Sequence, residues 1–185
     1  MPQPPEPHDR VIERTRLWLE RAVIGLNLCP FAKAVHVKRQ VHFAVSDAAD
    51  PKDLLDDLAA ELEALMQAAP EARETTLLMA PHCLADFLDF NDFLGRGEKL
   101  IARRGLEGTV QLASFHPHYQ FAGSEAEDIG NFTNRSPYPT LHLLREASID
   151  RAVQAYPDPE AIYQANIETL RRLGRQGWVA LEVGP

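Results

Sequence analysis

Cysteine is scarce in this 185-residue chain, which contains only Cys29 and Cys83. Two cysteines cannot form the network of several disulfides that stabilises small secreted domains. The first residues also lack the basic stretch followed by an apolar run that marks a secretory signal. These absences exclude a disulfide-stabilised secreted protein and predict a reduced, cytoplasmic one.

Positive charge is also in short supply, with 19 Lys and Arg against 27 Asp and Glu, a formal net charge of -8. Binding to a phosphate backbone needs clustered Lys and Arg. The RRLGR run at residues 171–175 is the only basic stretch. No apolar run reaches the roughly 20 residues that a membrane helix needs. We therefore expect neither a nucleic-acid partner nor a membrane partner.

What the chain does contain suits one ordinary domain. Hydrophobic residues make up 45% and charged residues 25%, both usual for a globular protein. Residues 1–7 hold four prolines and show no apolar periodicity, which predicts a flexible tail. We expect a single domain over residues 8–185.

Hydrophobic periodicity divides this domain into helices and strands. Helical spacing covers residues 8–26, 51–66, 84–101 and 139–155, and a last helix starts at Asp158-Pro159. Apolar and polar residues alternate over residues 35–45, and strands are also indicated at residues 75–80 and 109–115. The final WVALEV predicts either a fourth, edge strand or a docked tail.

Strands that alternate with helices predict an α/β sandwich, with helices packed on a largely parallel sheet of three or four strands. The carboxyl ends of parallel strands share one sheet edge, where ligands of open α/β sheets bind. The residues just after these ends are Ser46-Asp47, Pro81-His82-Cys83 and His116-Pro117-His118. We therefore expect the functional site at this edge.

His116 and His118 are two residues apart, so an extended backbone points both rings to one face. Such a pair can hold a metal ion. It can also supply a metal-free catalytic or binding histidine, or be structural. A third metal ligand would come from His142, Cys29, Glu125, Glu127 or Asp128, and no spacing selects one of them.

An anion site is indicated further on, around Asn134-Arg135-Ser136 and Tyr138. The Arg135 guanidinium suits a carboxylate or phosphate. A helix that begins here would favour an anion too, although Pro137 and Pro139 lack the N–H groups that would bind it. On that helix His142 and Arg145 would be neighbours. The alternative is an ordinary helix start with surface ion pairs.

Cys29 follows the first predicted helix, in the sequence Cys29-Pro30. The negative end of the helix dipole disfavours a thiolate there, unless Lys33 and His36 offset it. Three roles stay open for this residue: a reactive thiol, a small buried hydrophobic residue, or a haem contact of the Cys-Pro type. Gly-rich phosphate loops and the HExxH, CxxC and Gly-x-Ser-x-Gly motifs are absent.

Three separated motifs carry a resemblance to a known family. They are NLCPFAK at residues 27–33, FLDFNDFL at 87–94 and NRSPYPTLHLLRE at 134–146. Together they resemble an uncharacterised bacterial family catalogued as domain of unknown function 1415, over nearly the whole chain. The resemblance implies no particular activity. It implies that the Cys-Pro turn, the HPHYQF segment and the SPYP segment belong to one site.

These observations predict an enzyme that acts on a small, anionic molecule. His116 or His118 would act as general acid or base. Arg135 and Arg145 would bind the substrate, oriented by Asn134, Ser136 and Tyr138, with His142 and Cys29 completing the site. The alternative is a non-catalytic protein that binds a metal or a metabolite, and a third hypothesis is an interaction protein in which these residues are scattered. The reaction, the cofactor and the oligomeric state stay open.

Overall fold

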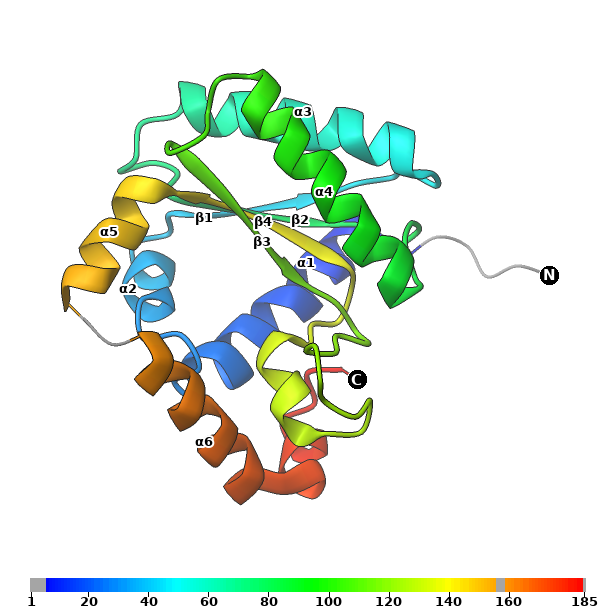
Figure 1. Cartoon of the computed structure of the whole chain (residues 1–185), viewed down its shortest axis with the longest axis vertical. Coiled ribbons are helices and arrows are strands. Elements are labelled where there is room, and N and C mark those ends of the chain that lie inside the picture. The colour runs from blue at the N-terminus through cyan, green and yellow to red at the C-terminus, as the bar shows by residue number, and fades with distance from the viewer. Residues whose placement is uncertain (1–5, 156–158, 185) are drawn as a thin grey trace.

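The computed structural model describes residues 6–155 and 159–184. It contains a single four-stranded sheet between two layers of helices (Figure 1). In spatial order the strands are β1 (Val41–Val45), β2 (Thr75–Met79), β4 (Thr140–Arg145) and β3 (Val110–Phe115). Helices α3 (Pro51–Gln67) and α4 (Phe87–Arg103) cover one face. On the other side lie α1 (His8–Trp18), α2 (Ala32–Val37), α5 (Glu146–Ala155) and α6 (Pro159–Ala180). The α/β class is confirmed.

The expected largely parallel sheet is wrong. Only β1 and β2 pair in parallel, while β4 is antiparallel to both of its neighbours, β2 and β3. The cause is residues 140–145, which were expected in a helix and form the inserted strand. The three strands expected from the sequence still point the same way, because β2 and β3 both oppose β4. Their carboxyl ends therefore share one edge.

Strand β4 carries apolar residues on both faces. Leu141 and Leu143 belong to the core beneath α3 and α4, whereas Leu144 and His142 face the opposite side. A strand covered on both faces has no alternation of polar and apolar residues, so its pattern cannot be told from that of a buried helix. The helix begins only at Glu146, and His142 and Arg145 consequently lie on opposite faces instead of side by side.

Two further expectations are corrected near the ends of elements. Residues 35–37 belong to α2, and β1 starts at Val41, after a left-handed residue, Arg39, with φ 58°. The WVALEV segment forms no strand, because the helix resumes after a break at Gly174, φ 66°, and runs to Ala180, and Val183 is buried, as the docked tail requires. Asp158, expected to start the last helix, lies outside the described residues.

Helices α3 and α4 begin where local chemistry places them. The Asp50 carboxylate accepts hydrogen bonds from the Lys52 and Asp53 amides at 2.8 and 3.1 Å, with Pro51 at the first helical position. Asp86 caps α4 in the same way. These caps hold two helices whose apolar sides pack on the sheet, and both expected helices are confirmed.

A π-helix, η1 (Leu19–Ile24), continues α1. The Gly25 and Leu28 amides donate to the carbonyl oxygens of Glu20 and Val23, each at 2.9 Å and each five residues back. A Cβ at Gly25 would collide with the Arg21 carbonyl oxygen. Gly25 therefore permits the wide turn, and π-turns of this kind often occur at functional sites.

The two helical layers enclose two separate cores. One lies between α3, α4 and the sheet, and the other joins α1, η1 and the end of α6 to the opposite face. A 3-10 segment, η2 (Ile129–Asn134), packs against α6. Residues 1–5 of the expected tail lie outside the described residues, whereas the Glu6 carboxylate accepts a 2.6 Å hydrogen bond from the Tyr138 hydroxyl.

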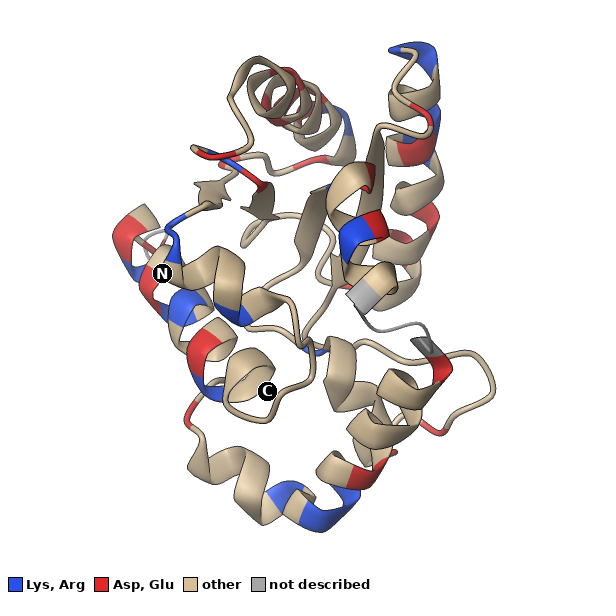
Figure 2. Ribbon diagram, turned by 90° about the vertical axis from the view of Figure 1, so that its left-hand side faces the viewer, with Lys and Arg blue, Asp and Glu red and all other residues tan. Residues whose placement is uncertain are grey.

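Charged residues of both signs are distributed over the helices (Figure 2). The RRLGR run lies on α6, and its Arg175 pairs with Glu127. No helix among the described residues is long and apolar enough to span a membrane.

Candidate functional site

A pocket of about 780 Å³ opens on the sheet face opposite α3 and α4. The sheet contributes residues of all four strands, among them Val41, Leu77, Phe115 and Leu144. The other walls come from Trp18 and η1, the segment from Cys29 to Val35, and α5. The volume lies within the range of sites that enclose small molecules, and most of the lining is apolar.

His142 projects from β4 into the lining of this pocket. Its Nε2 lies 2.6 Å from the Thr75 hydroxyl oxygen, and the Thr75 hydroxyl also contacts the Leu143 carbonyl oxygen at 2.7 Å. The hydroxyl has a single hydrogen, which it donates to the carbonyl. His142 must therefore carry its own proton on Nε2 and donate it to Thr75. Its Nδ1 is left as a lone-pair acceptor.

Nothing among residues 6–155 and 159–184 hydrogen-bonds to that Nδ1. The ring is half-buried, and its exposed part faces the pocket. Removal from bulk water lowers the pKa of His142 to about 4, so the imidazole is neutral at neutral pH. The pocket thus contains a neutral hydrogen-bond acceptor in apolar surroundings.

Cys29 lies in the same lining, within the turn between η1 and α2. It is half-buried and forms no disulfide. Leu19 and Val23 reach the pocket from η1, so the π-turn shapes the wall beside this thiol. The structure therefore brings Cys29 and His142, two residues expected in the site, to one lining, which also includes Arg145.

Five charged residues complete the lining: Lys38, Glu71, Glu74, Arg145 and Arg151. The buried Glu74 carboxylate accepts hydrogen bonds from the Ser148 hydroxyl and from Arg151, the latter at 2.5 Å, and so anchors α5 to the sheet. Lys38 and Glu71 are exposed and mark the opening.

His116 lies outside the pocket, at the carboxyl end of β3 and against α4. Its Nδ1 accepts the His118 amide hydrogen at 3.0 Å, so its Nε2 carries the proton that is donated to the Leu84 carbonyl oxygen, also at 3.0 Å. The ring is fully buried beside Phe87 and Phe90, and this burial lowers its pKa. Neither nitrogen is available to a metal ion or a substrate in this arrangement.

His118 is exposed, with its ring centre 5.9 Å from that of His116. No group of three or more His, Cys, Asp or Glu in the described part of the chain could hold a metal ion. The other candidates for a third ligand include Glu125 and Glu127, whose backbone carbonyls accept hydrogen bonds from Asn131 and Arg175, and Asp128, which caps η2.

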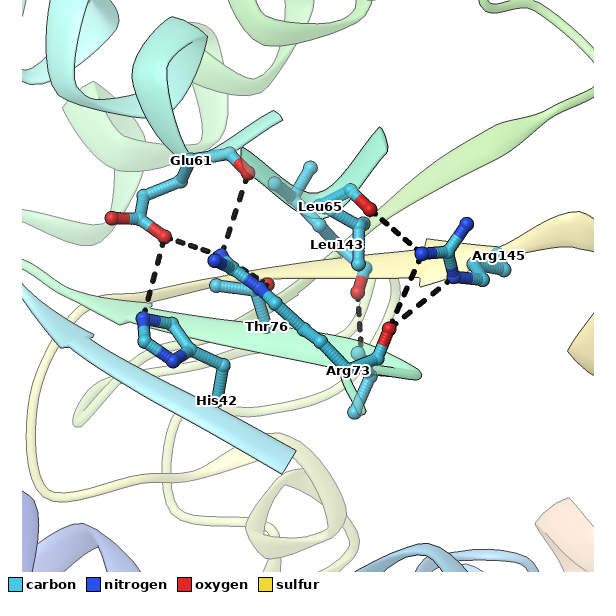
Figure 3. A network of polar contacts seen from close by, with 8 residues as sticks. His42, Glu61, Leu65, Arg73, Thr76, Leu143 and Arg145 are labelled. Carbon is cyan, nitrogen blue, oxygen red and sulfur yellow. Dashed lines mark hydrogen bonds and ion pairs between the residues drawn. The ribbon is translucent and has the colours of Figure 1, made fainter. Parts of the chain in front are cut away.

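Arg145 is held by backbone carbonyl groups. Its guanidinium donates to the carbonyl oxygens of Leu65 and Ala68, both at 2.7 Å, at the end of α3. Figure 3 shows the bond to Leu65. The guanidinium also donates to the Arg73 carbonyl oxygen, and Arg73 in turn pairs with Glu61. Arg145 therefore caps the carboxyl end of α3, where unpaired carbonyl groups need donors.

The remaining expected residues stabilise the connection between β3 and β4. Arg135 donates to the carbonyl oxygens of Tyr119 and Ala126 and stacks on Phe132 at 4.3 Å. Asn134 donates to the Ser114 carbonyl oxygen. Ser136 donates to the Tyr138 carbonyl oxygen, and the pKa of Tyr138 is raised to about 12 by burial and by Glu6. None of these four residues lines the pocket.

Sequence reasoning missed Trp18, Thr75 and Lys38 as pocket residues. Thr75 and Thr76 open a strand that is buried throughout, and a buried hydroxyl needs a partner, which was the one available signal. Trp18 was assigned to an ordinary helical stripe. Lys38 lay in a segment expected to be a strand.

The structure is an α/β protein with one mixed sheet and a pocket over one sheet face. A family model described as a protein of unknown function (DUF1415) matches residues 10–180, and the chain belongs to that family. The resemblance seen in the three motifs is thereby confirmed. No curated protein and no solved structure matches the chain.

Proposed function

We propose that the protein binds a small, largely apolar organic molecule in the pocket. The observation that carries this proposal is the free Nδ1 of His142. A donor group on a ligand can bond to this nitrogen, and a hydrogen bond of this kind contributes about 0.5–1.5 kcal/mol. The hydrogen bond to Thr75 fixes the ring before the ligand arrives, so little ordering is needed on binding.

The surroundings of His142 support the same proposal. The pocket volume of about 780 Å³ matches sites that enclose most of a drug-sized molecule. The π-helix beside it is a rare turn of a kind that often occurs at functional sites. The arginines first expected to grip an anion, Arg135 and Arg145, are engaged by backbone carbonyls, so we assign recognition to His142.

A thermal-shift screen tests this proposal with a library of neutral, anionic and cationic small molecules. Ala152 lines the pocket from α5, so an Ala152→Phe substitution fills part of it. Ala60 lies on the exposed side of α3, which makes Ala60→Phe the matched control. We expect ligands that raise the Tm of the wild type and of Ala60→Phe, and that act far less on Ala152→Phe. Equal shifts in all three proteins, or no ligand at all, would contradict the proposal.

Catalysis is the second candidate function, because a thiol and an imidazole line the same pocket. His142 is a weak general base, since its pKa of about 4 lies far below neutrality, which is why binding is preferred. Release of nitrophenolate from nitrophenyl esters tests this alternative. Loss of release in Cys29→Ser, with Cys83→Ser as control, would favour an enzyme, and equal rates in both variants would exclude a nucleophilic Cys29.

A further inference from the structure

The charges around the pocket differ from those of the whole chain. The full sequence carries a formal net charge of -8. The lining includes three cations, Lys38, Arg145 and Arg151, and two carboxylates, Glu71 and Glu74. The Arg145 guanidinium lies at the end of α3, on the other face of the sheet, so Lys38 and Arg151 are the cations that face the pocket. They balance the two carboxylates, and the pocket is therefore less acidic than the chain as a whole.

Lys38 is the cation available to a negative charge on a ligand. Arg145 is engaged by backbone carbonyls and Arg151 by Glu74. Within the described residues the Lys38 ammonium has no hydrogen-bond or ion-pair partner, and it is exposed at the opening of the pocket. The exposed Glu71 carboxylate nearby opposes a second negative charge on the ligand.

Between these two polar points the lining is apolar. Leu77, Phe115 and Leu144 form the sheet side, and Leu19 and Val23 face the pocket from η1. A ligand that fits must therefore have a hydrocarbon body, because a polar body would lose its hydration without gaining partners. The Nδ1 of His142 is an acceptor in this lining that has no hydrogen-bond partner among the described residues, so it favours a donor group on the ligand.

We propose that the ligand is an amphipathic monocarboxylic acid that also carries a hydroxyl group. The hydroxyl donates to His142, the hydrocarbon body fills the pocket, and the carboxylate lies beside Lys38. This inference rests on the proposed function, because it requires the pocket to be a ligand site.

Fluorescence of Trp18 provides the test, because Trp18 lines the pocket and is one of only two tryptophans. The other, Trp178, packs on Phe132 away from the lining, so a Trp178→Phe background leaves a single reporter. Three probes form a matched series: ω-hydroxydodecanoate, dodecanoate and dodecane-α,ω-diol. Their flexible chains adapt to the pocket, so differences in affinity report on the end groups.

We expect ω-hydroxydodecanoate to bind most tightly. Removing the hydroxyl should weaken binding by about three- to tenfold, the value of one hydrogen bond. Removing the carboxylate should weaken it by about two- to fivefold, and less at high salt, because Lys38 is exposed. Lys38→Met should remove the carboxylate's advantage. Lys33→Met, an exposed lysine of α2 outside the lining, is the control and should retain it.

Each part of this inference can fail separately. If the diol binds as tightly as the hydroxy acid, the proposal that the ligand carries a carboxylate is wrong. If dodecanoate binds as tightly, the proposal that it carries a hydroxyl group is wrong. If none of the three probes binds while other library molecules do, the ligand class is wrong and the proposed function stands. If nothing in the library binds, the proposed function falls with it.

Discussion

The Thr75 hydroxyl and the His142 imidazole meet at 2.6 Å although they are not opposite each other in the sheet. Thr75 faces Leu144 across the β2–β4 ladder, and His142 faces Leu77. The two side chains are diagonal neighbours on one face, a separation that a histidine can bridge. The bond couples the start of β2 to the middle of β4 and sets which nitrogen faces the pocket.

Replacing Thr75 with valine should therefore destabilise the protein by about 1–3 kcal/mol. The change keeps the shape of the side chain but leaves the His142 Nε2–H and the Leu143 carbonyl oxygen without this partner. Urea unfolding measures the loss. Thr15→Val is the control, because the equally buried Thr15 hydroxyl bonds only to the Val11 carbonyl within its own helix. Equal losses in both variants would contradict the role given to Thr75.

The stability of the fold should fall as the pH drops from 7 to 5. Folded His142 has a pKa of about 4, while an unfolded histidine has a pKa near 6.5, so only the unfolded state takes up the proton in this range. The expected loss from this residue is about 2 kcal/mol. Between pH 7 and 5 the His142→Leu variant should lose less stability than the wild type, by that amount. The lowered pKa of His116 gives the variant a residual slope of the same sign.

Arg145→Met should lower the free energy of unfolding by about 2–4 kcal/mol. The substitution removes the charged donors from the Leu65 and Ala68 carbonyl groups at the end of α3. The exposed Arg103 has no such contacts, so Arg103→Met should change stability by less than about 0.5 kcal/mol. Urea unfolding of the two variants gives the comparison. A fully stable Arg145→Met protein would return this arginine to the candidates for binding a ligand.

Two glycines should respond to alanine in opposite directions. Gly25→Ala places a methyl group against the Arg21 carbonyl oxygen, so the π-helix must rearrange, and we expect a loss of about 1–3 kcal/mol. Gly95→Ala meets nothing within 4 Å in the middle of α4 and should stabilise the protein by about 0.5–1 kcal/mol. Thermal unfolding distinguishes them. A neutral Gly25→Ala would mean that the turn does not depend on close approach.

Local signals were sufficient for much of the fold. Asp50-Pro51 begins α3 as expected, and the apolar run from Thr75 predicts β2 because a strand covered on both faces must be apolar throughout. Residues 140–145 were assigned to the wrong class for the same physical reason. Their leucines satisfy a helix as well as a buried strand, and only pairing with β2 and β3 decides between them.

Part of the candidate site could be found in the sequence because it consists of residue types that carry chemistry. His142 and Cys29 were selected on that ground and lie in one pocket. His116 was selected on the same ground, yet both of its nitrogens serve the backbone, since a buried histidine must satisfy them. The side chains that meet in the pocket are those that point to the same face of the sheet. The sheet topology decides which face each residue of a strand occupies.

The position of β4 also orders events during synthesis. It is the last strand to leave the ribosome and it lies between β2 and β3, which share no hydrogen bonds with each other. Until residue 145 has emerged, β3 has no partner strand, and the edges of β2 and β3 that β4 later covers are open to pairing with other chains. Completion of the sheet, and of the pocket wall that contains His142, must wait for this central strand.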